Sequence, residues 1–266
     1  MEYKRLAQFI ESLPGQGRYT FTLQEVRGLF DRSDSAINAA LFRASRKGLT
    51  HAIRKGFYVV VTPEYRPRGI LPPVLFIDGL MQYLGRKYYA GLLSAATMHG
   101  AAHQQPQEFQ IITQPPALRT ISAHGVRIRF FCKRIVPEKG IMQMKTDTGQ
   151  IQVSSPELTS IDLIMFERRI GGIDRAAEVF TELAPMLNQR PLLDLLPSVC
   201  PVAVAQRIGY LLDTIAGNKE LADVLHGSLR NRTLFPVPLS TVAPVRGTGP
   251  ANRWKIIVNT RLEGEE

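Results

Sequence analysis

The stretch FTLQEVRGLFDRSDSAINAALFRASRKGLTHAIRKGFYVVV, residues 21–61, decides the fold of the N-terminal part of this chain. Its apolar spacing changes from helical to alternating near residue 48. The predicted elements are a helix over 23–30, a turn at 31–32, a helix over 33–47, and strands over 49–53 and 57–61. This order is typical of a winged helix-turn-helix, a module that docks on duplex DNA.

The second predicted helix carries most of this prediction. Ser33 or Asp34 is a suitable N-cap, because either side chain can accept a hydrogen bond from a free amide of the first turn. The apolar residues recur at helical spacing and form one stripe, Ile37, Ala40, Leu41 and Ala44. We expect this stripe to pack on Leu23, Val26 and Leu29 of the preceding helix.

The opposite face of that helix carries the candidate DNA-binding residues, with Ser35, Asn38, Phe42, Arg43 and Arg46 exposed together. Asn and Arg side chains suit base edges, whereas Ser, Arg and Lys suit phosphates. The N-terminal end of such a helix usually enters the major groove. We therefore predict base contacts for Arg32, Ser33, Ser35 and Asn38, and backbone contacts for Arg43, Arg46 and Lys47.

The two strands form a predicted β-hairpin, the wing. Gly56 permits the positive φ that a tight turn needs. Arg54 and Lys55 lie at the tip, within reach of phosphates or a minor groove. Phe57, Val59 and Val61 alternate with Tyr58 and Val60, so one side of the strand is expected to close the small core.

The charge distribution agrees with nucleic-acid binding. The chain has a net charge of +10, and residues 1–70 hold 12 Lys and Arg against 6 Asp and Glu. Residues 71–150 hold 9 against 4, and residues 151–266 hold 12 against 13. The positive excess therefore lies in the first 150 residues, which predicts salt-sensitive nucleic-acid affinity there.

The chain is long enough for two domains. The segment 63–73 contains four prolines and is the candidate linker, semi-extended, with Arg66 and Arg68 able to follow a phosphate backbone. We predict an α+β protein with a winged helix-turn-helix over 1–70 and a larger mixed domain over 71–266. The second domain is expected to begin with helices over 75–83 and 88–102, to continue with strands to residue 154, and then to be helical up to a closing strand over 254–259. On its strand over 126–131, Arg127 and Arg129, followed by Lys133 and Arg134, extend the predicted basic track.

The composition indicates a cytoplasmic protein. Cys132 and Cys200 form no CxxC pair and suit a reducing compartment. The N-terminus lacks the apolar core of a signal peptide. No run approaches the roughly 18 apolar residues of a membrane span.

The sequence offers no catalytic motif, so we predict no enzymatic activity, no cofactor and no metal. His99 and His103 lie four residues apart, but Gly100 occupies the position where the zinc-protease pattern needs Glu. Glycine-rich phosphate loops and the GxSxG elbow are absent from the sequence. A helix start and an exposed face explain Glu157 and Asp162 more simply than an acid pair does.

Three stretches resemble the AbiEi-type antitoxins of bacterial, often type IV, toxin–antitoxin systems. The first is the winged helix ending in RKGFYV, residues 54–59. The second, and the most specific, is YYAGLLSAATMHG, residues 88–100, with HQQPQ at 103–107. The third comprises SSPELT at 154–159, GGI at 171–173, QRIGYLLD at 206–213 and RWKIIVN at 253–259.

The resemblance implies two activities. The N-terminal domain of this family binds inverted repeats in its own promoter and represses the operon. The remainder opposes a nucleotidyltransferase-like toxin, without requiring direct contact with it. The family fixes no catalytic residue, and its recurrent polar positions correspond here to His99, His103, Gln104, Gln107, Glu157, Thr159, Asp162 and Arg207. We expect these to be buried groups that orient the core through hydrogen bonds.

Two other classes of protein share some of these features. One is a nucleic-acid-processing enzyme that uses the winged helix to present its substrate, which would need a clustered acid or metal site in residues 71–266. The other is a protein-interaction module, in which Arg43→Ala or Arg54→Ala would leave DNA affinity unchanged. Autorepression as an antitoxin accounts for more of the sequence than either.

Overall fold

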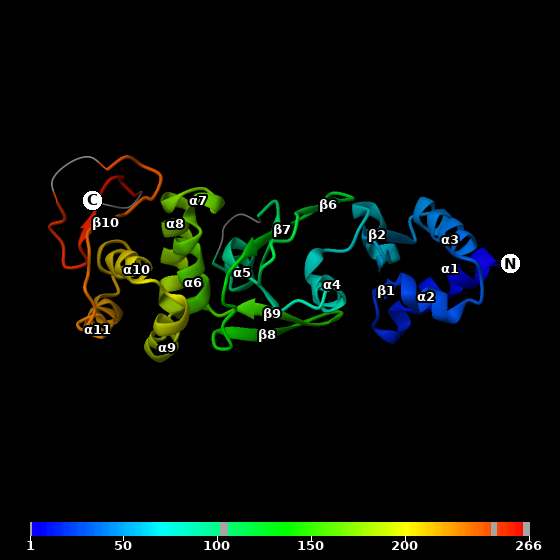
Figure 1. Ribbon diagram of the computed structural model, residues 1–266, viewed down its shortest axis with the longest axis horizontal. Coiled ribbons are helices and arrows are strands. Elements are labelled where there is room, and N and C mark those ends of the chain that lie inside the picture. Colours follow the sequence, from blue (N-terminus) through cyan, green and yellow to red (C-terminus); the bar gives the residue numbers. More distant parts are fainter. Residues whose placement is uncertain (1, 102–105, 246–248, 263–266) are drawn as a thin grey trace. The chain divides into compact units, whose positions relative to one another are not determined.

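The computed structural model describes residues 2–101, 106–245 and 249–262 (Figure 1). The chain is a mixed α+β protein, as predicted. Its contacts divide it into unit 1, residues 1–88, 107–133 and 143–152, and unit 2, residues 89–106, 134–142 and 153–266. The division at residue 70 stays a prediction.

Unit 1 begins with three helices around a small sheet and continues with the strands of a second sheet. Its helices are α1 (Glu2–Ser12), α2 (Leu23–Leu29), α3 (Asp34–Arg46) and α4 (Ile77–Tyr83), with 3-10 turns η1 (Pro14–Gln16), η2 (Pro63–Arg68) and η3 (Pro73–Leu75). Its strands are β1 (Thr20–Thr22), β2 (Thr50–Arg54), β3 (Phe57–Val60), β5 (Phe109–Thr113), β6 (Ile121–Ala123) and β7 (Val126–Cys132), and most of β8 (Ile141–Thr146) and β9 (Gly149–Ser154).

The small sheet has the strand order β1-β3-β2, and both pairings are antiparallel. β3 is therefore the central strand. An irregularity between Ala52 and Arg54 shifts the register at the end of β2. Gly56 adopts φ 80°, so the positive φ predicted for the hairpin turn is confirmed.

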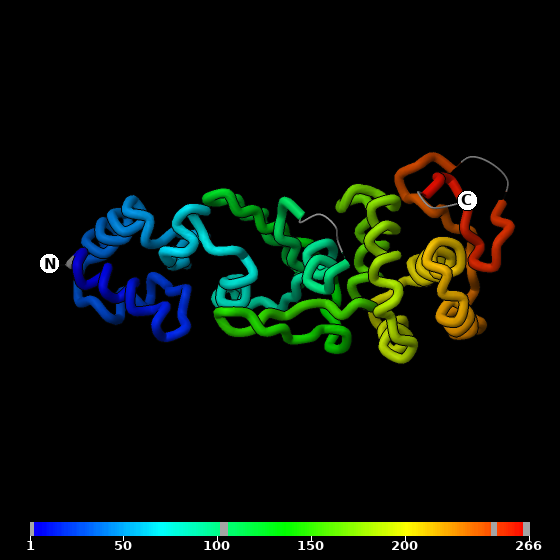
Figure 2. The backbone as a smooth tube through the Cα atoms, turned by 180° about the vertical axis from the view of Figure 1, so that it is seen from behind, coloured from blue at the N-terminus to red at the C-terminus, as the bar shows by residue number. Residues whose placement is uncertain are grey.

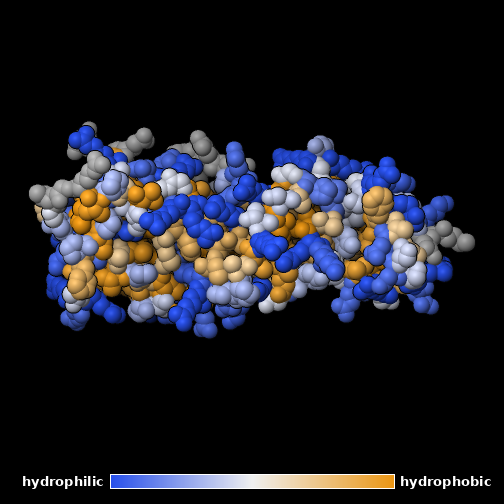
Figure 3. Space-filling model, turned by 45° about the horizontal axis from the view of Figure 1, so that its top comes forward, coloured by the Kyte–Doolittle hydropathy of each residue, from blue (hydrophilic) through white to orange (hydrophobic). Residues whose placement is uncertain are grey.

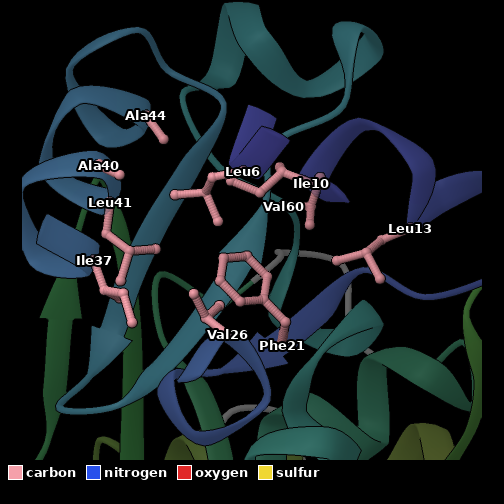
Figure 4. Close-up of a cluster of buried hydrophobic side chains, with 10 residues drawn as sticks. All are labelled: Leu6, Ile10, Leu13, Phe21, Val26, Ile37, Ala40, Leu41, Ala44 and Val60. Atoms are coloured by element: carbon pink, nitrogen blue, oxygen red, sulfur yellow. The ribbon is translucent and has the colours of Figure 1, made fainter. Parts of the chain in front are cut away.

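The core of this region lies between α1, α2, α3 and the sheet, and Figure 4 shows its side chains converging. Ser33 caps α3, since its hydroxyl accepts a hydrogen bond from the Ala36 amide. The predicted apolar stripe of α3 is confirmed, because each of its four residues is buried. The full cluster is Leu6, Ile10, Leu13, Phe21, Val26, Ile37, Ala40, Leu41, Ala44 and Val60.

One detail of the predicted core was wrong. Leu29 is 60% exposed, because the α3 stripe meets Val26 and the apolar face of α1 instead. Leu29 lines, with Arg5 and Arg32, an open hollow of about 400 Å³. One side of β3 closes the core as predicted, through Val60 and Tyr58. The other side is also covered, because the ring centres of Phe57 and Tyr83 lie 5.4 Å apart.

The proline-rich segment after the wing is not semi-extended. It folds into η2 and η3 and buries Ile70 and Leu71 between them. A proline at the first position of each 3-10 turn sets φ for a helical start, which is why the prolines begin turns here.

Beyond α4, β7 pairs in parallel with β5 and antiparallel with β6.

Unit 2 is mainly helical (Figure 2). Its helix α6 contacts α5, α8 and α10. The predicted helix over 88–102 was wrong at its start, because the buried residues 88–90 form a strand and only 92–98 are helical. The elements are β4 (Tyr88–Ala90), α5 (Leu92–Met98), α6 (Pro156–Met165), α7 (Glu167–Ile170), α8 (Ile173–Leu183), η4 (Ala184–Met186), α9 (Gln189–Val199), α10 (Val202–Thr214), α11 (Lys219–Ser228), β10 (Val237–Pro238) and β11 (Ile256–Ile257).

Trp254 anchors the C-terminal segment of unit 2 in the core. Its side chain is 1% exposed, and its indole nitrogen donates a hydrogen bond to Asp213 at 2.6 Å. The ring lies against Gly209 of α10, where a side chain would not fit. The closing strand is shorter than the predicted 254–259, because only Ile256–Ile257 pairs, in parallel with β10.

Among the described residues, no helix is long and apolar enough to cross a membrane. Hydrophilic and hydrophobic residues are interspersed over the face seen in Figure 3.

Candidate nucleic-acid interface

The exposed face of α3 carries the residues that the sequence singled out. The side chains of Ser35, Asn38, Arg43 and Arg46 are exposed, as are Arg32 and Ser33 at the helix start and Lys47 at its end. They share this face because Ile37, Leu41 and Ala44 commit the other face to the core. The structure thus groups seven of the candidate residues on α3 and its two ends.

Aromatic and ionic contacts orient this helix. Tyr3 of α1 lies beneath two of the cations, with the Lys47 ammonium 4.5 Å and the Arg43 guanidinium 6.0 Å from its ring centre. Arg27 of α2 donates two hydrogen bonds, of 2.8 and 2.7 Å, to Asp34 in the first turn of α3. This pair offsets the charge of Asp34, the acidic side chain in the first turn of α3, where an anion such as phosphate is otherwise favoured.

Two hydrogen bonds to its backbone carbonyl oxygens fix the hairpin turn. The Tyr83 hydroxyl donates a hydrogen bond to the Lys55 carbonyl oxygen at 3.1 Å, and the Leu23 amide donates to the Gly56 carbonyl oxygen at 2.9 Å. The Lys55 side chain is exposed and that of Arg54 is half-buried. The turn is therefore fixed while its ammonium group is open to solvent.

Arg66 and Arg68 both lie on η2, and both are exposed. Arg66 lines a surface hollow together with Tyr3, Lys4 and Lys47. It therefore adjoins the C-terminal end of α3. Arg68 is the last residue of η2 and precedes Gly69.

The basic residues on β7 pair with an acidic side chain, and the lysine that follows the strand is buried. Glu108 accepts a hydrogen bond from Arg129 at 3.0 Å and lies 3.4 Å from Arg127. Lys133 is 7% exposed. The predicted extension of the basic track through these residues is weakened, because a carboxylate offsets part of their charge and Lys133 is buried.

Four of the polar residues expected in the core, Glu157, Thr159, Asp162 and Arg207, are buried and paired, whereas Gln107 is exposed, so the prediction was wrong there. The Tyr89 hydroxyl donates to Asp162 at 2.7 Å, and both residues are 0% exposed, so the exposed face expected for Asp162 was wrong. Burial, together with the Asp162 carboxylate, raises the pKa of Tyr89 well above its ordinary value. The Thr159 hydroxyl lies 2.6 Å from that of Ser154. These contacts agree with a structural role.

The other recurrent polar positions also tie segments of unit 2 together. Glu157 accepts hydrogen bonds from the Asn188 amide and the Ser155 hydroxyl. Arg207 donates to the Pro238 carbonyl oxygen at 2.9 Å, and burial lowers its pKa while Glu167 opposes that shift. The His99 ring nitrogen Nε2 lies 2.7 Å from the Ser154 carbonyl oxygen. His103 and Gln104 lie outside the described residues.

Within the described part of the chain, no group of three or more His, Cys, Asp or Glu side chains is placed to hold a metal ion. The sequence did not indicate the supporting contacts of Tyr3 or the Arg27–Asp34 pair. Tyr3 lies in α1, before the stretch 21–61 on which the prediction depends, and Arg27 and Asp34 belong to different helices. Only the packing of α1 and α2 against α3 brings these side chains together.

Comparison with protein families decides the identity of the central segment. Residues 89–214 match the model described as the AbiEi antitoxin C-terminal domain. This segment belongs to the AbiEi antitoxin family. The resemblance predicted from the sequence is thereby confirmed. The match of residues 89–214 to this family supports an antitoxin role in a toxin–antitoxin system.

Two solved structures are similar to the chain. The crystal structure of the RV2827C protein from Mycobacterium tuberculosis has a TM-score of 0.64 at 16% identity, covering 93% of this chain and 89% of that one. It shares the fold. An antigenic nucleotidyltransferase-like protein from Paracoccidioides brasiliensis has a TM-score of 0.35 at 9% identity, covering 57% of this chain and 89% of that one. No curated protein matches the chain.

Proposed function

We propose that this AbiEi-type chain is an antitoxin that also represses its own promoter, with α2, α3 and the β2–β3 hairpin acting as a winged helix-turn-helix. The observation that carries the proposal is the exposed, polar and basic face of α3 beside the turn at Arg54 and Lys55. A helix of this kind fits a major groove, and a basic hairpin fits the flanking backbone.

The contacts divide by chemistry. Arg32, Ser33, Ser35 and Asn38 face base edges near the start of α3. Lys47, supported by Tyr3 and adjoining Arg66, meets phosphates at the other end together with Arg43 and Arg46. Arg54, Lys55 and Arg68 hold the flanks. Inverted repeats then require two copies of the chain on one operator.

The test is a gel-shift titration on the chain's own upstream intergenic DNA and on scrambled DNA, at two salt concentrations. Wild-type protein is expected to shift the promoter selectively and to weaken as salt rises. The informative variants are Arg43→Ala and Arg54→Ala, and the matched control is Arg230→Ala, an exposed arginine of unit 2. Equal, weak binding to both DNAs would remove autorepression.

The partner toxin is proposed to be nucleotidyltransferase-like, as the family resemblance implies. Co-expression of toxin with wild-type chain or with the Arg43→Ala variant separates the two activities. If neutralisation depends on the buried architecture of unit 2, the variant protects cells when supplied from an unrelated promoter. Loss of protection at equal protein level would place neutralisation on the DNA-binding face instead.

A further inference from the structure

Phe42 is the one large apolar side chain on the exposed face of α3. It is 64% exposed, although it lies in the middle of the helix. An aromatic ring that remains in water forgoes the stabilisation that burial would give. Its place between exposed hydrogen-bonding residues on the same side of α3, rather than its exposure alone, makes it a candidate for binding.

The surroundings of Phe42 favour a nucleic-acid partner over a protein partner. Asn38 lies one turn before it and Arg46 one turn after it, and both are exposed. These neighbours donate hydrogen bonds and carry positive charge. A protein-docking surface needs a broader apolar area, whereas the exposed residues of α3 other than Phe42 are polar, charged or, at Ala39, small.

In the major groove, an apolar group is available at one kind of base edge. Thymine presents its C5-methyl there, while the other edges of the four standard bases present donors and acceptors. An exposed phenylalanine between hydrogen-bonding residues has the chemistry that matches this methyl. Helix positions 38, 42 and 46 follow one side of α3, so their side chains meet successive parts of one groove.

We propose that Phe42 is a specificity-determining residue that contacts the C5-methyl of a thymine in each half of the operator. This inference rests on the proposed function, because it assumes that α3 occupies the major groove. It goes further by naming a base that the operator must contain and the atom that is recognised.

The experiment replaces single thymines of the shifted promoter fragment with deoxyuridine, which lacks only that methyl. Wild-type protein is expected to bind about fourfold more weakly when the contacted thymine is replaced, the value of one buried methyl group. Substitutions at other positions leave affinity unchanged. The Phe42→Ala variant is expected to bind the thymine and uracil operators equally, whereas Phe42→Leu retains part of the preference.

The outcomes separate this inference from the proposed function. Selective promoter binding with no sensitivity to deoxyuridine would overturn the role of Phe42 and leave autorepression standing. Deoxyuridine sensitivity that persists in Phe42→Ala would assign the methyl contact to another residue and overturn it equally. Absence of selective promoter binding would overturn both. The deoxyuridine series uses wild-type protein, so it does not depend on the folding of a variant.

Discussion

The exposed face of α3 and the interior of unit 2 are both rich in polar side chains, but they use them in opposite ways. Asn38, Arg43 and Arg46 lie open to solvent, whereas Tyr89 and Asp162 are buried against each other. A buried polar group must be satisfied within the protein, because water cannot reach it. Burial therefore separates residues that hold the fold from residues offered to a partner.

The largest expected effect tests the interior side of this comparison. Gly209→Ala places a Cβ 2.2 Å from ring atoms of the buried Trp254. Because neither α10 nor the anchored ring can move freely, we expect a loss of about 3 kcal/mol or more in the free energy of unfolding. Denaturant unfolding measures it.

Gly227→Ala is the matched control for this change. Gly227 also lies in a helix, α11, but an added Cβ meets nothing within 4 Å. It should be neutral or stabilise by up to about 1 kcal/mol, since alanine favours a helix. Equal effects of the two substitutions would contradict the close packing of Trp254 on α10.

Removal of a single hydroxyl compares a buried tyrosine with an exposed one. Tyr89→Phe leaves the buried Asp162 carboxylate without one of its donors, and we expect a cost of about 1–3 kcal/mol. Tyr83→Phe removes a hydroxyl from a residue that is 43% exposed, and water replaces the lost hydrogen bond. Urea titrations of both variants are the measurement. A cost as large for Tyr83 as for Tyr89 would mean that burial does not distinguish these groups.

The exposed side of the comparison is tested by affinity. Arg43→Ala should weaken promoter binding about tenfold. It should also make the slope of log affinity against log salt shallower by about one, the value of one lost phosphate contact. The free energy of unfolding should stay within about 0.5 kcal/mol of wild type, because the side chain is exposed. Gel shifts at several salt concentrations and a melting curve give both values. A variant that loses stability as well as affinity would show that this arginine also supports the fold.

The sequence predicted features that depend on local periodicity. The stripe of α3 and its Ser33 cap are confirmed, since helical spacing and capping act within a few residues. Leu29 was misplaced because its environment depends on how α2 meets α1. The double burial of β3 follows from packing on both of its faces, the helical core on one side and Tyr83 on the other, which alternation alone does not give.

The remaining errors and omissions arise from contacts between distant residues. A short apolar run such as residues 88–90 fits a helix or a strand equally well, and here it is a strand. The Tyr89–Asp162 pair joins residues 73 positions apart. For the candidate interface, sequence spacing grouped the α3 residues, but the supports from Tyr3 and Arg27 required the packed helices.

The smallest expected effect concerns a half-buried group that lies between the two extremes. His51 of β2 stacks on His124, with ring centres 3.6 Å apart. Burial, reinforced by the charge that His124 can carry, lowers the pKa of His51 below its usual 6.5, although the nearby Gly69 backbone opposes the shift. The folded state thus binds fewer protons than the unfolded state below pH 6.5. The contribution of His51 to the free energy of unfolding should be fully present above pH 6.5. It should decline as the pH falls from 6.5 toward the folded pKa.

NMR titration of the histidine ring protons measures this pKa directly, and urea unfolding between pH 7.5 and 5.5 measures its consequence. His124→Gln removes the neighbouring charge, so it should bring the pKa of His51 closer to 6.5 and flatten the decline. His51→Gln should remove this contribution altogether. A pKa of His51 at or above 6.5 in the wild-type protein would contradict the stacked, half-buried arrangement and would place this histidine with the solvent-exposed residues of α3.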